Sequence, residues 1–316
     1  MKARSMLAGL AALALAATAS VSARADEFIT VLSGGTSGVY YPLGAALAKI
    51  YGEKIPGARP TVQATKASVE NLNLLQQGKG EIAFTLGDSL AAAWTGDAEA
   101  GFKTKLDKLR GVTAIYSNYI QIVAAKDSGI ATLADLKGKR LSVGAPKSGT
   151  ELNARAILAA AGLSYSDLGK VEYLPFGESV ELMKNRQLGA TLQSAGLGVS
   201  SIRDLASSVD ITVVEIPQAV IDKAGAPFVA TDIPAGTYAK QDKPVRTAAV
   251  VNYLVTRADL PDDLVYQMTK AIYENLGELQ AAHSAAKGIK LENAKLGMPV
   301  PLHPGAAKYF AEKGVK

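Results

Sequence analysis

The chain has 316 residues, of which 48% are hydrophobic and 20% are charged, so it is long enough for about two packed domains. It contains no cysteine, which excludes disulfides, thiolate metal sites and cysteine nucleophiles, and its two histidines, His283 and His303, are too few for a multi-histidine metal centre. The formal net charge is +5, but no basic run interleaved with aromatic residues indicates nucleic-acid binding. We therefore expect no metal, no cofactor and no nucleic-acid partner.

Residues 1–25 have the pattern of a cleaved secretory signal peptide: a basic start at Lys2 and Arg4, an apolar run over 6–17, and Ala23-Arg24-Ala25 as a cleavage site. A retained anchor is the alternative, but the apolar run is too short to span a bilayer. Removing Lys2, Arg4 and Arg24 lowers the 34 basic residues to 31, against 29 acidic ones. We therefore expect a nearly neutral mature protein in a bacterial periplasm.

Strand and helix patterns alternate along the mature chain. Residues 28–32 predict a strand, which ends in a loop of glycine, serine and threonine over 33–38. Pro42 is placed in the first turn of the following helix. Ser68 is a candidate N-cap of the next helix, and residues 81–86 predict a short buried strand. The polar stretch 94–105 is expected at the surface.

Residues 112–125 predict one or two strands, interrupted at Ser117-Asn118. Residues 140–143 predict a strand, 144–149 a glycine-bearing loop and 150–161 a helix. Further strands are expected at 171–174, 190–193, 211–214 and 248–255, and Pro261 opens a long helix. This alternation is typical of parallel-rich sheets covered by helices on both faces.

Two segments share one construction, in which a strand leads through a glycine and hydroxyl-rich loop into a helix. They span residues 32–42 and 143–155. At such a junction the free backbone N–H groups and the helix dipole favour an anion. Neither segment matches a phosphate-binding loop or a dinucleotide fingerprint, and ordinary helix capping is the alternative for each. Two such loops facing each other across a cleft could hold a small anion from both sides.

Six short motifs, in this order, make the chain similar to the TAXI family, the solute-binding proteins of tripartite ATP-independent periplasmic (TRAP) transporters. They are Gly35-Thr-Ser-Gly-Val-Tyr-Tyr-Pro42, Asp135-Leu-Lys-Gly-Lys-Arg-Leu-Ser-Val143, Ser148-Gly-Thr-Glu-Leu-Asn-Ala-Arg155, Ile233-Pro-Ala-Gly-Thr-Tyr238, Val255-Thr-Arg-Ala-Asp-Leu-Pro261 and Pro301-Leu-His-Pro-Gly-Ala306. The resemblance covers nearly all of residues 28–313.

The resemblance implies an α/β fold of the two-lobed periplasmic binding protein type (type II-like), with two mixed sheets flanked by helices and joined by hinge strands. The expected division is 26–125 plus 229–316 for one lobe and 126–228 for the other. It also implies a monomer without catalysis, which captures a small organic anion by hinge closure and delivers it to a TRAP permease. The family's ligands are mainly glutamate, glutamine and related C5 dicarboxylates.

Two departures from the family bear on the ligand. Tyr116-Ser117-Asn118 stands where the family commonly has Tyr-Pro-Glu, and Leu86-Gly87-Asp88 where it commonly has Gln-Ser-Asp. If these positions face the ligand, the site lacks a carboxylate to pair with an amino group. A 2-oxo or 2-hydroxy diacid, such as 2-oxoglutarate or 2-hydroxyglutarate, then fits better than glutamate.

The candidate ligand-binding residues are drawn from both loops and from strand ends. They are Gly35, Thr36, Tyr40, Asp88, Tyr116, Asn118, Ser148, Gly149, Thr150, Arg155 and Gln193.

For three of these candidates, another role is open. Arg155 could pair with a ligand carboxylate or with Glu151, four residues earlier. Asp88 could instead cap a helix, and Asn118 could make a turn.

Two other function classes remain open from the sequence. The same fold could serve an ABC importer or a sensor for another small anion. An exported hydrolase with Ser148 as nucleophile is the enzyme alternative, although the Gly-x-Ser-x-Gly elbow is absent.

Overall fold

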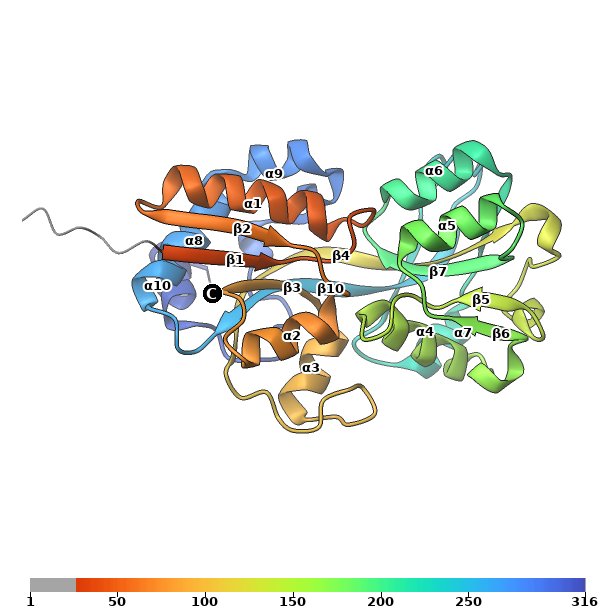
Figure 1. Cartoon of the computed structure of the whole chain (residues 1–316), viewed down its shortest axis with the longest axis horizontal. Helices are drawn as coiled ribbons and strands as arrows, with labels where there is room; N and C mark the ends of the chain where they lie inside the picture. Colours follow the sequence, from red (N-terminus) through yellow and green to blue (C-terminus); the bar gives the residue numbers. More distant parts are fainter. Residues whose placement is uncertain (1–26, 316) are drawn as a thin grey trace, which may run out of the picture.

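The computed structural model describes residues 27–315, so the predicted signal peptide lies outside the described residues. The chain forms two α/β lobes that lie side by side and are linked by two long strands (Figure 1). The strands are β1 (Glu27–Leu32), β2 (Ala58–Gln63), β3 (Ile82–Leu86), β4 (Leu109–Ala125), β5 (Arg140–Ser142), β6 (Lys170–Glu172), β7 (Ala190–Ala195), β8 (Ile211–Val214), β9 (Val229–Ile233) and β10 (Val245–Arg257).

Helices connect most of the strands. They are α1 (Tyr40–Lys54), α2 (Ser68–Gln76), α3 (Gly87–Thr95), α4 (Gly149–Ala160), α5 (Phe176–Lys184), α6 (Ser200–Ser208), α7 (Gln218–Ala224), α8 (Asp262–Glu274), α9 (Leu276–Ala282) and α10 (Pro304–Glu312). We call the part that holds α1 to α3 and α8 to α10 the first lobe, and the part that holds α4 to α7 the second lobe (Figure 1).

The sheets of the two lobes form one hydrogen-bonded ladder in the order β2-β1-β3-β10-β4-β7-β5-β6. In the first lobe, β1 pairs with β2 and β3 in parallel, while β10 runs antiparallel to β3. In the second lobe, β5 pairs with β6 and β7 in parallel, and β4 pairs with β7 and β8 antiparallel. The two expected mixed sheets are thus continuous through β4 and β10, which occupy the place of the expected hinge strands.

The interruption expected at Ser117-Asn118 is wrong, because β4 runs unbroken from Leu109 to Ala125. At this point the partners of the strand change. Asn118 still pairs with Val250 of β10, whereas from Tyr119 onward β4 also pairs with β7. The polar pair therefore marks the crossing from one lobe to the other. The residues at which the lobes divide stay a prediction.

Helices cover both faces of the ladder, as the alternating pattern predicted. One hydrophobic core lies under α1, α8 and α10 in the first lobe and continues under α5 and α6 in the second. On the opposite face, α2 and α3 bury Leu72, Leu75 and Leu90 against the first lobe, and α4 buries Ile157 and Leu158 against the second. Among the described residues, no helix combines the length and apolar character that crossing a membrane requires.

Two starts of helices can be compared with the predictions. Pro42 lies in the first turn of α1, as predicted. At α10, His303 is the cap and accepts a hydrogen bond from the backbone N–H of Gly305 (3.2 Å). The cap expected at Ser68 is wrong. Ser68 is itself the first residue of α2, and its hydroxyl accepts a hydrogen bond from the backbone N–H of Leu86 instead (3.1 Å).

Candidate functional site

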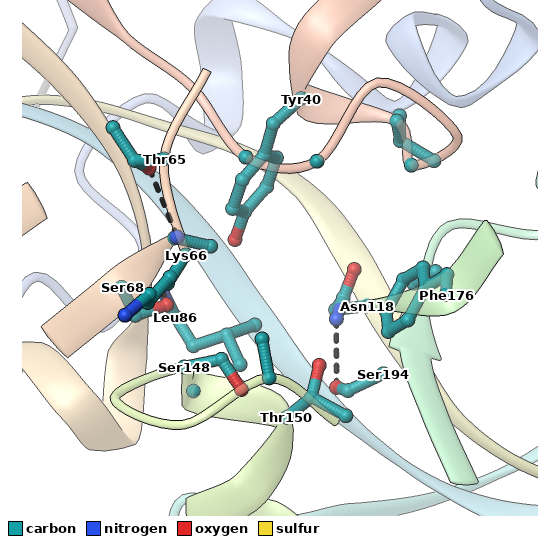
Figure 2. A pocket seen from close by; sticks show the side chains of 18 of the residues that line it. Tyr40, Thr65, Lys66, Ser68, Leu86, Asn118, Ser148, Thr150, Phe176 and Ser194 are labelled. Atoms are coloured by element: carbon teal, nitrogen blue, oxygen red, sulfur yellow. Dashed lines mark hydrogen bonds between the residues drawn. The ribbon is translucent and has the colours of Figure 1, made fainter. Parts of the chain in front are cut away.

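A cavity lies between the two lobes, with an empty volume of about 720 Å³ that includes its opening to solvent. Both lobes and the crossing strand β4 contribute to its wall (Figure 2). The lining residues are Gly34, Gly35, Gly38, Val39, Tyr40, Thr65, Lys66, Ala67, Ser68, Leu86, Tyr116, Asn118, Ala145, Ser148, Gly149, Thr150, Pro175, Phe176, Ser194 and Ala195.

Four helices begin at this cavity: α1 and α2 from the first lobe, and α4 and α5 from the second. The first N–H groups of a helix have no acceptor within the helix, and its N-terminus carries a partial positive charge. At α4, Ser148 is the N-cap and accepts from the N–H of Glu151 (3.1 Å), so its own hydroxyl proton is free for a ligand. The cavity is thus lined by positive helix ends on opposite walls.

The loop before α4 needs glycine. Gly144 follows β5 with φ +96°, and a Cβ at this position would lie 2.7 Å from Cγ2 of Thr150. Ala67, just before α2, has φ 70° and ψ −146°, a conformation that ordinarily only glycine adopts. Strained backbone of this kind clusters at binding sites, and here it turns the chain into α2 at the cavity wall.

Hydrogen bonds tie the cavity floor together at the crossing between the lobes. The hydroxyl of Tyr40 donates to the side-chain oxygen of Asn252 on β10. Asn252 in turn donates to the side-chain oxygen of Asn118 (3.2 Å) and to the backbone oxygen of Tyr116 (3.1 Å). The ring of Tyr40 stacks on Phe84, with ring centroids 4.9 Å apart. These contacts fix Tyr40 and Asn118 at the base of the site.

The network continues into the second lobe. Asn118 donates to the hydroxyl of Ser194 (2.7 Å), which donates to the side-chain oxygen of Asn153 on α4 (2.7 Å). The amide of Asn153 then donates to Oδ2 of Asp88 on α3 of the first lobe (2.6 Å). Asp88 does not line the cavity, and burial raises its pKa to about 6. This chain of hydrogen bonds therefore connects Asn118, on the crossing strand β4, through Ser194 and Asn153 of the second lobe to Asp88 of the first lobe.

The electrostatics of the lining favour an anion without a cationic group. Among the described residues that line the cavity, Lys66 is the one with a charged side chain, and it is exposed. None of these lining residues is acidic. The hydroxyl of Tyr116 is buried with no hydrogen-bond partner within residues 27–315, and burial raises the pKa of Tyr116. Tyr116 therefore remains a neutral donor that a bound ligand could engage.

The lobes touch across the cavity, so this is a closed arrangement. The N–H of Glu70 on α2 donates to the backbone oxygen of Lys147 in the second lobe (3.2 Å), and the hydroxyl of Ser200 donates to the backbone oxygen of Ser37 (2.9 Å). Gly149 approaches the first lobe so closely that a Cβ there would lie 2.6 Å from Cδ1 of Leu86. Both predicted glycine loops thus face the same cavity, from opposite lobes.

The structure brings most of the predicted site residues together. The cavity is lined by Gly35, Tyr40, Tyr116, Asn118, Ser148, Gly149 and Thr150, whereas Thr36, Asp88, Arg155 and Gln193 are not on its wall.

The four residues outside the wall have other surroundings. Thr36 is exposed on its loop. Arg155 pairs with Glu151 (2.7 Å), the alternative that the helical spacing offered, and Gln193 accepts from Ser201 (2.6 Å) inside the second lobe. Asp88 receives its side-chain hydrogen bond from Asn153 and makes no cap to α3. Contact of any of the eleven with a ligand stays a prediction.

Sequence reasoning missed several parts of the wall. Thr65 and Ala67 follow β2 in a stretch without glycine, and Phe176 begins α5 without any capping signal. Asn252 lies within the strand predicted at 248–255, where a buried amide has no local signature. Ser68 was noticed, but for capping rather than for its place on the wall. Among the described residues there is no cluster of side chains able to hold a metal ion.

Comparison with known proteins places this architecture in a family. A model of the NMT1-like family matches residues 31–314. The chain belongs to the NMT1-like family.

Solved structures share the fold of this NMT1-like protein at low sequence identity. The periplasmic binding protein BugD is 11% identical, with a TM-score of 0.57 over 93% of this chain and 99% of that one. A putative L-cystine ABC transporter protein from Listeria monocytogenes is 14% identical, with a TM-score of 0.51 over 84% and 98%. A Bordetella bronchiseptica protein is 18% identical, with a TM-score of 0.50 over 91% and 80%. The expected fold of a two-lobed periplasmic binding protein is confirmed.

Proposed function

We propose that this protein is a periplasmic solute-binding protein that captures a small organic carboxylate between its lobes and delivers it to a membrane permease of the TRAP type. One observation carries the proposal: glycine loops from both lobes lead into helix N-termini on opposite walls of one cavity between the lobes. A carboxylate at each wall would receive backbone N–H donors and a favourable helix dipole. Ligand contacts made only when both walls meet would stabilise the closed state and so drive hinge closure.

The class of carboxylate follows from the two walls and from the charges. A C5 dicarboxylate offers one group to the loop before α1 and one to Ser148, Gly149 and Thr150. Its 2-substituent would lie near Asn118, which is an amide rather than a carboxylate. Because no acidic side chain is on the described wall, an ammonium group would be buried without a counter-ion. We therefore rank 2-oxoglutarate and 2-hydroxyglutarate above glutamate.

The direct test is thermal unfolding of ligand-stripped mature protein with glutamate, glutamine, 2-oxoglutarate, 2-hydroxyglutarate, C4 diacids and aliphatic sulfonates. A ligand at about 100 times its dissociation constant adds about 2.7 kcal/mol of stability. For a chain of this length the corresponding rise in Tm is about 5–10 °C. A rise with the 2-oxo or 2-hydroxy diacid supports the proposal. A rise with glutamate alone contradicts the ranking, and no rise with any carboxylate contradicts the ligand class.

The permease partner has an alternative. A structural neighbour is described as an ABC transporter protein, so the same fold also serves importers driven by ATP. A permease gene without an ATPase beside the gene for this chain would favour the TRAP type.

The hydrolase alternative has less support. The side chain of Ser148 caps α4, while His283 and His303 each accept from a backbone N–H two residues further on.

A further inference from the structure

Asp88 lies behind the cavity, at the contact between the two lobes. It is the second residue of α3 in the first lobe, and its Oδ2 accepts a hydrogen bond from Asn153 of the second lobe (2.6 Å). Its other oxygen, Oδ1, and the hydroxyl of Ser89 are both buried with no hydrogen-bond partner in the described part of the chain. The closed arrangement thus holds this carboxylate by a bond across the lobes and leaves half of it unsatisfied.

The bond to Asp88 determines how the amide of Asn153 is oriented. Because the amide nitrogen donates to Asp88, the amide oxygen faces Ser194 and accepts from its hydroxyl (2.7 Å). Ser194 then accepts from Asn118 (2.7 Å), and both of these residues line the cavity. Without an acceptor at position 88, the amide of Asn153 would lose the bond that fixes its orientation, and the hydroxyl of Ser194 could turn toward the ligand or away from it.

We propose that Asp88 is a positioning residue for ligand binding, which holds Asn153 across the interface and takes up a proton when the lobes close. The proposal rests on the proposed function, since it treats closure as the binding step. The proton would bind at Oδ1, the oxygen without a partner, and the hydroxyl of Ser89 is the adjacent acceptor. Oδ2 would keep its hydrogen bond from Asn153. Protonation therefore removes a buried charge without breaking the polar chain.

The electrostatic surroundings supply no compensating charge. Burial raises the pKa of Asp88 to about 6, although the backbone at Ser89 and Asp88 and the nearby side chains of Asn153 and Ser89 act in the opposite direction. The elements packed against α3 are α2, α4, β3 and β10. No residue of β3 is titratable, and Tyr40, which faces Asp88 from α1, donates to Asn252.

The titratable side chains nearest α3 on the other three elements are bonded elsewhere. On α2, Glu70 accepts from the N–H of Lys66 (2.6 Å). On α4, Glu151 and Arg155 pair with each other (2.7 Å). On β10, Tyr253 donates to the backbone oxygen of Leu296 (2.8 Å). Arg257 pairs with Glu81 and Asp259. Arg246, at the other end of the strand, pairs with Asp232.

The sign of the pH dependence follows from the two states. An aspartate exposed to water has a pKa of about 3.9. If opening hydrates Asp88, the closed state binds the proton more tightly, so closure becomes more favourable as the pH falls through about 6 and gains nothing further below about 4. Between pH 7 and pH 5 the ratio of closed to open protein should rise roughly tenfold.

The test measures closure without any ligand. Because the chain has no cysteine, the exposed Lys103 of the first lobe and Lys170 of the second can be replaced by cysteine and labelled for single-molecule energy transfer. We expect the closed-to-open ratio to rise roughly tenfold from pH 7 to pH 5 in the mature protein. Asp88→Asn keeps an acceptor for Asn153 but carries no charge. In this variant the closed-to-open ratio at pH 7 should equal the value that the unsubstituted protein reaches at pH 5, and it should not change between the two pH values.

Controls separate this proposal from the proposed function. Ser89→Ala keeps the carboxylate of Asp88, so its closed-to-open ratio should still rise from pH 7 to pH 5. If Asp88→Asn does not fold, Asp88→Ala takes its place in the comparison. The proposal is overturned if the closed-to-open ratio of the protein with Asp88 does not change between pH 7 and pH 5. It is also overturned if the ratio rises equally in the variant that lacks Asp88. Binding of 2-oxoglutarate is then measured on the same proteins. Binding without a pH step contradicts only the role of Asp88, whereas a pH step without binding contradicts only the ligand.

Discussion

Gly149 of α4 and Ser68 of α2 meet at the interface between the lobes, where a Cβ on Gly149 would lie 2.6 Å from the hydroxyl oxygen of Ser68. The same Cβ would lie 2.9 Å from the hydroxyl of Ser89. Real Cβ atoms do not approach other atoms this closely, so a side chain at position 149 requires either that Leu86, Ser68 and Ser89 shift or that the lobes move apart. The closed state, rather than the helix, therefore favours glycine at this position.

This contact predicts that Gly149→Ala blocks closure. We expect at least a tenfold loss of affinity for 2-oxoglutarate in calorimetric titration, with no loss of thermal stability in the ligand-free protein, because alanine is favourable within a helix. Gly277→Ala on α9 is the matched control, since no atom lies within 4 Å of its added Cβ. Equal affinities in the two variants would show that the close approach is not needed for binding.

Ser148 combines a structural and a binding role, and two substitutions separate them. Ser148→Ala removes both the cap of α4 and a hydroxyl donor, so we expect a loss of about 1 kcal/mol of unfolding free energy and weaker binding. Ser148→Asp keeps a good capping side chain but places a negative charge on the wall. Urea denaturation should show near wild-type stability for this variant, while 2-oxoglutarate binding is lost. Retained binding in Ser148→Asp would mean that the anion does not sit at α4.

The buried cap of α10 predicts an acid-sensitive stability. Nδ1 of His303 accepts from the N–H of Gly305, and Nε2 is buried with no partner within residues 27–315. Burial lowers the pKa of His303, although Asp262 and the backbone at Leu260 act in the opposite direction. The unfolded chain therefore binds the proton more readily, so this contribution to stability is complete above about pH 6.5 and is lost as the pH falls.

The check is chemical denaturation between pH 8 and pH 5. In His303→Asn, which retains a capping side chain, the fall in unfolding free energy toward pH 5 should be smaller than in the wild type. Asp88 contributes in the opposite direction in both proteins and so cancels in the comparison. Parallel pH profiles for the two proteins would contradict the assignment to His303.

Local signals in the sequence, together with the family resemblance, were sufficient for the architecture and for seven of the twenty residues that line the cavity. Alternating strand and helix patterns predicted sheets covered by helices on both faces, the family resemblance implied the two lobes, and the glycine loops predicted Tyr40 and Ser148 on the cavity wall. What failed depended on pairing that is distant in sequence. Ser117-Asn118 was read as a break because polar residues interrupt a strand pattern, yet Asn118 is satisfied by Ser194 and Asn252, which are 76 and 134 residues away. Such partners have no signature near position 118.

Asn118 offers a test of ligand charge. It places an amide on the cavity wall at the position where the TAXI family, which the sequence resembles, commonly has glutamate. Asn118→Asp has nearly the same shape and can still accept from the amide of Asn252, and it can accept from Ser194 when that hydroxyl turns away from Asn153. The new charge would pair with an ammonium group and repel a 2-oxo acid. We expect the ratio of affinities for glutamate and 2-oxoglutarate to shift toward glutamate by about tenfold, or about 1.4 kcal/mol. Asn252→Asp, one step further from the cavity, is the control and should shift the ratio less. If both ratios stay at the wild-type value, the ligand's 2-position does not lie near Asn118, and the preference for a ligand without an amino group must have another origin.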